Sequence, residues 1–457
     1  MSSASGKKKK GGKWKRKKQK PKYLNPKDIP AELEQLFPDE TIERIAHETG
    51  FIKRERIVHP IPFFWALVIG YGTHLQRTLA GLRRSYQEMS GEEIVASSWV
   101  DRFTPALVKF LQAAVAHGLT QTANDAGRVL DEKLKRFEDI LIFDNSVVRL
   151  HEALAKRFPA TRSKKIAAGV KVSLLISAVA NGPKKVSIHS ENTADIKTLR
   201  VGPWVKDRIL LFDLGFYCFR LLARIDENKG FFVSRLKNDG NPTILKSLKV
   251  HRGRSIDIAG KKWQEIKDQL KREVFDAEVE VAFSRRAYRG KNSRDSKVLR
   301  LVAVWDEEHR EYHTYLTNIS EDVLSAEDVA ALYRVRWEIE LVFKELKSQY
   351  SLDELDTTNP NTVYGLIYTA ILTLIVSRRL HNLLLRSVPR ELAPRYTPLL
   401  WSKVFTELGH RLQGAMLDHI GFEEGPSDAF ATLAALYELQ ALDPNIKRHR
   451  LRNGWYR

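Results

Sequence analysis

Two short apolar segments of the sequence each end in an aspartate. One is Asp139-Ile-Leu-Ile-Phe followed by Asp144, and the other is Ile209-Leu-Leu-Phe followed by Asp213. Apolar runs of this length indicate buried strands, and acids at strand ends lie at the sheet edge where α/β proteins bind ligands. Paired carboxylates suit Mg²⁺, and two such ions can activate an attacking oxygen and stabilise a leaving one in phosphodiester chemistry. For either aspartate alone, an ordinary turn or capping residue is the better interpretation.

A third candidate acid, Glu340, lies in a segment with helical periodicity. Tyr333, Arg336, Glu340 and Lys347 follow the pattern Y-x2-R-x3-E-x6-K, and at about 100° per residue they share an arc of about 60°. Arg336 could grip a phosphate with two hydrogen bonds, and Lys347 could attract one as a point charge. A separate apolar arc would pack on the sheet, and it holds Leu332, Val335, Ile339, Val342, Phe343 and Leu346.

The same spacing also has a purely structural interpretation. Arg336 and Glu340 are four residues apart, which is the separation of an ordinary ion pair on a helix surface. On spacing alone, the metal-binding and the structural interpretations are equally good.

The whole pattern resembles a known family. The segment from Tyr333 to Lys347 is similar to the YREK signature of bacterial insertion-sequence transposases of the insertion-sequence-4 family, at the same spacing. Ile142-Phe-Asp-Asn-Ser resembles the family's first catalytic aspartate, and Phe212-Asp-Leu-Gly-Phe resembles the second. Phe232-Val-Ser-Arg-Leu-Lys and Thr317-Asn also fit, so the resemblance covers about residues 139–350.

The resemblance implies a fold, an activity and a cofactor. The fold would be α/β, with a ribonuclease-H-like catalytic core, an inserted β-rich subdomain and flanking N-terminal and C-terminal helical regions. Asp144, Asp213 and Glu340 would be the catalytic residues and would hold two Mg²⁺ ions, with Mn²⁺ as a substitute. The protein would cleave DNA at transposon ends and transfer the freed 3′-OH into target DNA. In relatives that 3′-OH can first attack the opposite strand to form a hairpin.

The resemblance also implies DNA contacts and partners. The partners would be double-stranded DNA, namely the terminal inverted repeats and the target, and a second copy of the chain in a synaptic homodimer. The residues expected to contact DNA are Tyr333, Arg336, Lys347, Trp337, Arg235 and Lys237. The aromatic candidates for holding a flipped base are Tyr312, Tyr315 and Trp305.

The periodicity along the chain divides it into regions that would position these residues. A helix is expected to start at the cap Ser325 and to run through Tyr350, and a capping box at Ser90 to start another. Basic loops at His251–Arg254 and Arg285–Asn292 separate strand-like runs. The expected regions are a disordered basic arm (1–30), a helical, DNA-end-binding domain (31–130), the first part of the catalytic core (131–237), a β-rich insertion (238–320), the last part of the core (321–360) and a C-terminal helical region for dimerisation or DNA contacts (361–457).

Composition limits the class of protein. The net charge of +20 in 457 residues points to a polyanionic partner. A single cysteine, Cys218, excludes disulfides within the chain and any zinc site built on several cysteines. The longest apolar run, 366–376, is too short to cross a bilayer, so we expect a cytoplasmic protein without a membrane partner. The Lys-rich arm fits a phosphate contact and a solubilising tail equally well.

Two alternatives to a transposase stay open at this stage. A nuclease on the same fold would use the same acids but could not rejoin strands, so only product analysis separates it. A non-catalytic DNA-binding protein derived from a transposase is disfavoured, because all three acids and their flanking cations are present.

Overall fold

The computed structural model describes most of residues 23–443. The ranges outside the description are 1–22, 55–57, 74, 76–77, 124–127, 162–166, 250–256, 286–292, 354, 422–427 and 444–457. Most of the expected basic arm, nearly all of the two expected basic loops and the basic C-terminal tail therefore lie outside the described residues.

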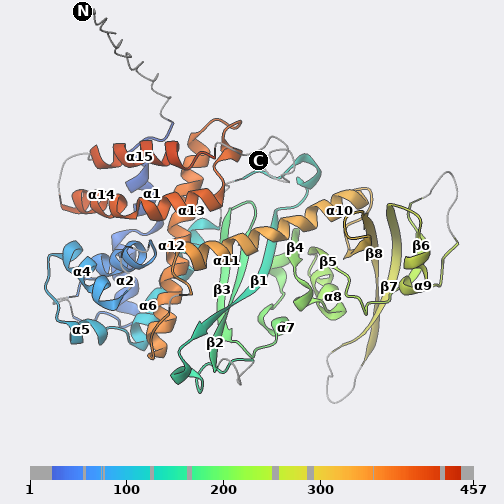
Figure 1. The fold of residues 1–457 in the computed structure, drawn as a ribbon, viewed down its shortest axis with the longest axis horizontal. Helices are drawn as coiled ribbons and strands as arrows, with labels where there is room; N and C mark the ends of the chain where they lie inside the picture. Colours follow the sequence, from blue (N-terminus) through green and yellow to red (C-terminus); the bar gives the residue numbers. More distant parts are fainter. Residues whose placement is uncertain are drawn as a thin grey trace, which may run out of the picture.

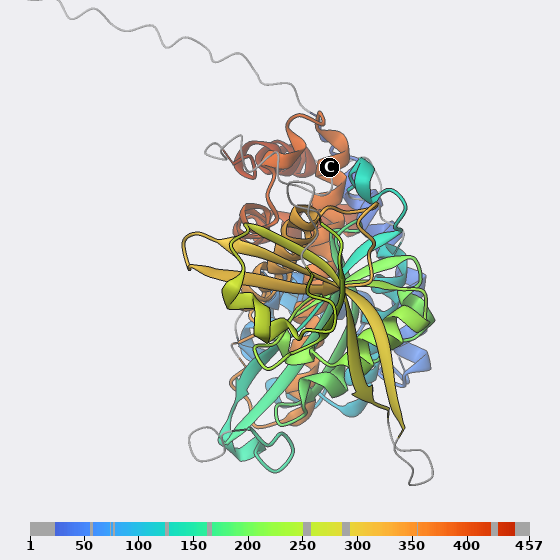
Figure 2. The same cartoon turned by 90° about the vertical axis from the view of Figure 1, so that its right-hand side faces the viewer.

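The architecture is mixed α/β, built on one nine-stranded sheet with the order β3-β2-β1-β4-β5-β9-β8-β7-β6. The strands twist strongly along the sheet (Figure 2). Their bounds are β1 (Asp139–Leu150), β2 (Ala168–Ser177), β3 (Gly182–Ser190), β4 (Arg208–Phe212), β5 (Phe231–Arg235), β6 (Thr243–Ser247), β7 (Val274–Ser284), β8 (Arg294–Asp306) and β9 (Glu311–Thr317).

Strand directions bring the two predicted aspartates to the same level. β1 pairs with β4 in parallel, and β4 pairs with β5 in parallel, whereas β2 and β3 are antiparallel to their neighbours. The last parallel pair of β1 and β4 is Phe143 with Phe212. Asp144 and Asp213 each follow directly, so they lie side by side where the parallel pairing of β1 and β4 ends.

The expected β-rich insertion does not form a sheet of its own. Its last strand, β9, is antiparallel to β5, and β8, β7 and β6 follow outward. The pairing continues the ladder beyond β5, which would otherwise present unpaired backbone groups. A buried ion pair between Arg300 and Asp276 joins β8 to β7, and Arg300 also donates to the carbonyl of Leu324 just before the next helix. The insertion therefore fixes where that helix begins.

Helices gather beyond the β3 edge and lie on both faces of the sheet (Figure 1). The bounds are α1 (Asp28–Leu36), α2 (Asp39–Glu48), α3 (Pro60–Trp65), α4 (Leu79–Ser90), α5 (Ala96–Val100), α6 (Pro105–Thr122), α7 (Asp195–Thr198), α8 (Phe219–Glu227), α9 (Trp263–Ile266), α10 (Ala326–Tyr333), α11 (Trp337–Gln349), α12 (Pro360–Ser387), α13 (Pro398–Glu407), α14 (Gly409–Gly421) and α15 (Asp428–Gln440).

The N-terminal and C-terminal helices share one core. α12 packs against α1 and α6 and also touches β3. Its length and hydropathy would suffice to cross a membrane, but 94% of its most apolar window is buried inside the protein, as in a core helix. The two helical regions expected from the sequence therefore pack as one body beside the sheet.

Three local expectations are wrong. Residues 23–30 are not part of a disordered arm, because Leu24 is buried, its amide donates to Glu438, and α1 begins at Asp28. Ser90 does not cap a new helix but ends α4, where Gly91 adopts the left-handed conformation that stops a helix. The helix from Ser325 is interrupted by a tight 3₁₀ turn at Arg334–Arg336, which separates α10 from α11.

Candidate active site

The acids lie on the sheet face covered by α10 and α11. Side chains alternate between the two faces along β1. Ile142 belongs to the hydrophobic core under these helices, whereas Phe143 belongs to the core on the opposite face. Asp144 therefore points toward α11, and by the same alternation after Phe212 so does Asp213. α11 crosses β1 and supplies Glu340 (Figure 1).

Arg336 lies between two of the acids. Its guanidinium is 2.6 Å from Glu340 Oε1 and 3.7 Å from Asp144 Oδ2. The i, i+4 ion pair of the structural interpretation therefore exists, but it also reaches across to β1. The structure thus brings together Asp144, Glu340 and Arg336, and Asp213 is close enough to act on the charges of both Asp144 and Arg336.

Asp144 is held in an environment that disfavours its charge. Burial, joined by the negative charges of Asp213 and Glu340, raises the pKa of Asp144 to about 6, against the opposing effects of the Asn145 amide and Arg336. Raised carboxyl pKa values next to other acids are typical of functional sites. A divalent cation among these oxygens would relieve the repulsion.

Asp144 differs from its expected position in one respect. It lies inside β1 rather than at its end, because β1 continues to Leu150 in antiparallel pairing with β2. Only the pairing with β4 ends before it. The backbone of Asp144 is therefore paired with β2 on one side and unpaired on the β4 side, and its side chain points toward α11.

Tyr333 joins the helical layer to the sheet rather than facing solvent. It is buried, and its hydroxyl donates to the carbonyl of Phe212 over 3.3 Å. Phe212 directly precedes Asp213, so this bond fixes the backbone from which the second acid projects. A contact between Tyr333 and DNA, as the resemblance implies, would require the ring to leave this position.

Three further interactions hold α11 in place. Lys347 donates from Nζ to the carbonyl of Val147 on β1 over 3.0 Å. Near the same end of the helix, the fully buried Glu345 forms an ion pair with Arg378 of α12 and accepts from the Tyr350 hydroxyl over 2.8 Å. This pair was not predicted from the sequence, although an acid beside the apolar arc of the helix indicates a buried partner.

A polar network around Asn145, the residue after Asp144, was also not predicted, and it lies on the opposite face of β1 from Asp144. The Asn145 side chain donates to Asp195 Oδ1 over 2.8 Å, and Lys171 donates to the same oxygen over 2.7 Å. Lys171 is buried within β2, and a lysine inside an otherwise apolar strand was the signal for a partner. Thr198 is hydrogen-bonded to Asn145 as well.

Asp195 also touches the loop that carries Asp213. A Cβ atom built on Gly215 would lie 3.1 Å from Asp195 Oδ2. A side chain at this position would press on the carboxylate, which explains a glycine two residues after Asp213. Asp195 therefore contacts both the residue after Asp144 and the turn after Asp213.

We expect Asp195→Ala to lower metal-dependent DNA cleavage by roughly 10-fold, because Asp195 supports the chain beside Asp144 and Asp213 without bonding to either acid. This is the low end of the roughly 10- to 100-fold cost of losing a direct partner of a metal ligand. The reason is that Asn145 and the buried Lys171 lose their shared acceptor. The check is the cleavage rate as a function of Mg²⁺ concentration, where half-saturation should move to higher Mg²⁺. Asp195→Glu should recover part of the rate, and a rate for Asp195→Ala within twofold of wild type would remove this role.

The remaining DNA-contact candidates lie in different surroundings. Trp337 is 58% exposed and follows the turn at Arg336. Arg235 lies at the end of β5, with a guanidinium nitrogen 3.3 Å from His313 Nδ1. The Lys237 ammonium is 5.8 Å from the centre of the Tyr217 ring.

The aromatic candidates are divided between the two sheet faces. Tyr315 packs against Tyr333 with ring centres 5.3 Å apart, on the face of the acids, but it is buried. Trp305 and Tyr312 pair across β8 and β9 with ring centres 5.0 Å apart, and Tyr312 packs against the core of the opposite face. Of the three, Tyr315 alone shares the face of Asp144.

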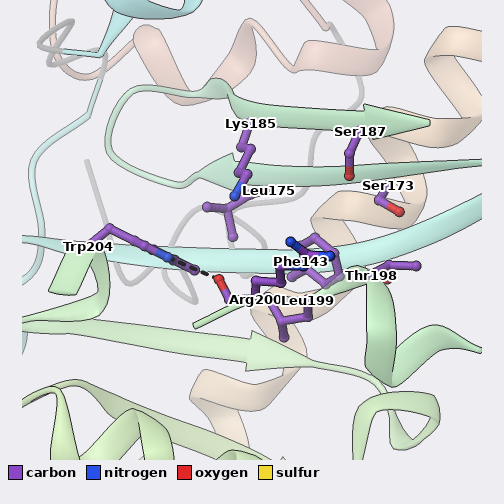
Figure 3. Close-up of a pocket in the computed structure, with 9 residues that line it drawn as sticks. All are labelled: Phe143, Ser173, Leu175, Lys185, Ser187, Thr198, Leu199, Arg200 and Trp204. Atoms are coloured by element: carbon purple, nitrogen blue, oxygen red, sulfur yellow. Dashed lines mark hydrogen bonds between the residues drawn. The ribbon is translucent and has the colours of Figure 1, made fainter. Parts of the chain in front are cut away.

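A small hollow is shown in Figure 3, and its lining residues Phe143 and Leu175 belong to the core on the face opposite the acids. It offers two exposed cations, Lys185 and Arg200, and no carboxylate, so its lining does not suit a divalent metal. The lining residues are Phe143, Ser173, Leu175, Lys185, Ser187, Thr198, Leu199, Arg200 and Trp204.

Comparison with known families identifies the class of protein. A family model described as "Transposase DDE domain" matches residues 135–376, a range that contains β1, β4 and α11. The chain belongs to this family, so it is a DNA transposase, an enzyme that cuts and joins DNA strands. Enzymes of this family generally depend on divalent metal ions.

The relatives are transposases of bacterial insertion sequences. The chain is 22% identical over 381 residues to the transposase for insertion sequence element IS1151 of Clostridium perfringens, which spans 76% of this chain and 78% of that protein. It is 23% identical over 397 residues to the IS231F transposase of Bacillus thuringiensis subsp. israelensis, which spans 79% and 82%. Among solved structures, a piggyBac transposase synaptic complex with hairpin DNA aligns over 92% of this chain and 86% of that chain, with 11% identity and a TM-score of 0.44.

Proposed function

We propose that Asp144, Asp213 and Glu340 are the catalytic carboxylates of a cut-and-paste transposase and hold two Mg²⁺ ions, with Mn²⁺ as a substitute. The observation that carries the proposal is the convergence of three acids from β1, β4 and α11 on one sheet face, with Arg336 bridging two of them. The ions would activate the attacking oxygen and stabilise the leaving oxygen of the DNA strand.

The donor set fits divalent metal. The site offers three carboxylates, which are the oxygen ligands that Mg²⁺ and Mn²⁺ prefer. The raised pKa of Asp144 reflects burial and negative neighbours, and a bound cation would offset both. The protein would supply the rigid frame, because β1, the Tyr333 bond to Phe212 and the Lys347 bond to Val147 hold the three acid-bearing segments together.

The strand order supports a ribonuclease-H-like core. Strands β3-β2-β1-β4-β5, with the first three antiparallel and the last two parallel to β1, follow the order and directions of that fold. We propose that residues 131–237 and 321–360 form this core and that 238–320 is an insertion which extends the same sheet. The helices of 31–130 would bind transposon ends.

The DNA partners would be the element's terminal inverted repeats and the target duplex. Of the candidate DNA contacts, Tyr333 is buried, and the others keep some exposure: Arg235, Lys237, Arg336, Trp337 and Lys347. A homodimer would hold two ends in a synaptic complex, and the freed 3′-OH would either attack the opposite strand to form a hairpin or attack the target directly. We propose that this takes place at the bacterial nucleoid in the cytoplasm.

Arg336→Ala should weaken binding to end DNA. The slope of log affinity against log salt concentration should become shallower by about one unit, which corresponds to the loss of one phosphate contact. The reason is that Arg336, beside two acids, would turn toward a phosphate once metal neutralises the carboxylates. The measurement is the end-DNA affinity at several salt concentrations in Ca²⁺, a divalent ion chosen to fill the site without cutting. A salt slope equal to that of wild type would show that Arg336 only pairs with its acidic neighbours.

Strand joining by pre-cut ends tests the proposed function. Purified protein, Mg²⁺, a duplex with a free 3′-OH at the element end and a supercoiled target plasmid should give joined products. Asp213→Asn should give none. Cutting by the wild-type protein without any joined product would instead identify a nuclease.

A further inference from the structure

A second group of metal-ligating side chains lies at the turn between β8 and β9. Asp306 ends β8, His309 lies in the turn, and His313 lies on β9. Their ligand atoms, one carboxylate oxygen and two imidazole nitrogens, all lie within 4.8 Å of one another. No step of the transposition chemistry above uses them.

The carboxylate of Asp306 is oriented by the turn itself. Its Oδ1 accepts the backbone amides of Glu308 and His309, over 2.9 and 3.3 Å. This leaves Oδ2 facing the two rings, 2.9 Å from His309 Nδ1 and 2.7 Å from His313 Nε2. A second set of bonds that orients a ligand is a regular feature of protein metal sites.

The distances are close to those that a bound ion needs. Zinc–nitrogen and zinc–oxygen bonds of about 2.0–2.2 Å in a tetrahedron require ligand atoms roughly 3.3 Å apart. The distances from Asp306 Oδ2 to the two imidazole nitrogens are slightly shorter than this. The side chain of His309 is 64% exposed, so its ring can move to adjust the distance between the two nitrogens. Two imidazoles and one carboxylate favour a transition metal over Mg²⁺.

We propose that Asp306, His309 and His313 form a site for a divalent transition metal of the zinc class, separate from the transposition site, with the remaining coordination positions open to water. β8 is three strands away from β4 in the sheet order, which is about 14 Å at the usual strand spacing. The ion would tie the turn to β9 and so fix the end of the hairpin.

Arg235 couples this site to the face of the catalytic acids. Arg235 and Tyr315 are paired across β5 and β9, and the Arg235 guanidinium is 3.3 Å from His313 Nδ1. Because guanidinium can only donate, Nδ1 accepts and Nε2 carries the ring proton toward Asp306. When a metal ion binds Nε2 of His313, the ring proton must lie on Nδ1. Nδ1 can then no longer accept a hydrogen bond from the Arg235 guanidinium, so metal binding releases Arg235.

Zinc binding to the full chain tests the proposal. Metal-stripped protein is titrated with Zn²⁺ in excess Mg²⁺, which fills the carboxylate site but competes poorly for histidine. Wild type should bind one equivalent of Zn²⁺ that the double variant His309→Ala/His313→Ala lacks, or binds at least about 100-fold more weakly. His410→Ala, an exposed histidine outside the cluster, should bind as wild type does.

Two controls keep the test independent of folding and of DNA cutting. Circular dichroism melting should show the same fold for wild type and the double variant. Co²⁺ bound at the site should give a visible absorption band that Asp306→Asn loses. An equal Zn²⁺ stoichiometry in wild type and double variant, or no Zn²⁺ bound by wild type at micromolar concentration, would overturn the site.

The link to Arg235 has its own measurement. Arg235→Ala should raise the Zn²⁺ affinity several-fold, because the proton on His313 Nδ1 no longer faces a cation. An unchanged or lower affinity would overturn the release of Arg235 by metal.

Discussion

Glu340→Gln is expected to abolish metal-dependent cutting, by roughly 10³-fold or more, while the fold and end-DNA binding persist. A loss of that size corresponds to about 4 kcal/mol of transition-state stabilisation, which is within the range a metal-bound site supplies. The amide keeps the size of the side chain and can still accept from Arg336, whose guanidinium is 2.6 Å from Glu340 Oε1. It carries no charge, so it is a poor ligand for Mg²⁺.

The same helix offers a matched control. Glu338 lies two residues earlier and pairs with Arg128 at 3.0 Å, away from the other acids. Glu338→Gln should cut at nearly the wild-type rate in the same gel assay of end DNA with Mg²⁺. Full cutting by Glu340→Gln, or equal losses in both variants, would remove Glu340 from the catalytic set.

Asp144→Asn is expected to stabilise the metal-free protein at neutral pH although it destroys activity. The pKa of Asp144 is raised from 3.8 to about 6 in the folded protein. The folded state therefore holds this proton more tightly than the unfolded state, and the resulting gain in the free energy of unfolding is complete below about pH 4. That gain is lost as the pH rises through about 6, where the folded protein must give up the proton. At pH 7.5 the cost reaches up to about 3 kcal/mol, and asparagine avoids it by resembling the protonated acid.

Urea unfolding in EDTA, at pH 4 and at pH 7.5, measures this effect. The variant should exceed wild type in free energy of unfolding at pH 7.5 and match it at pH 4. Asp268→Asn, at an exposed position far along the chain from the acids, should change stability by less than about 0.5 kcal/mol at either pH. Mg²⁺ should narrow the gap, since a ligand that binds the folded wild type stabilises it. A less stable variant in EDTA at pH 7.5 would contradict the crowded carboxylate site.

The pairing of the first two acids was predictable because it depends on local pattern. An apolar run followed by an acid indicates a buried strand, and two such runs in one α/β domain tend to be neighbours in the sheet. The length of β1 was not predictable in this way. The apolar run ends at Asp144, but β2 supplies pairing partners for Asn145 and Ser146 from Ser173 and Val172.

The position of the third acid was predictable to within a face of the helix, but not its neighbours. Periodicity placed Tyr333 and Arg336 on the same face of the helix. It cannot show whether the Tyr333 hydroxyl is exposed or donates a hydrogen bond to a backbone carbonyl of the sheet, as it does to Phe212. Nor does it reveal the 3₁₀ turn, which no proline or glycine marks.

Long-range contacts account for the rest of what sequence reasoning missed. No local pattern states that β9 pairs with β5, so the insertion could not be assigned to the same sheet. Asp195 lies fifty residues from Asn145, and their contact exists only once β1 and the loop before β4 are folded together.

Cleavage of the element's own ends tests the central claim most directly. Purified protein and Mg²⁺ are incubated with DNA that carries the terminal repeats and flanking sequence, with Asp144→Ala in parallel. The carboxylate site predicts metal-dependent nicks at the element boundary by wild type and none by the variant. Cutting at the same boundary by Asp144→Ala, or tight end binding by wild type without any cutting, would contradict it.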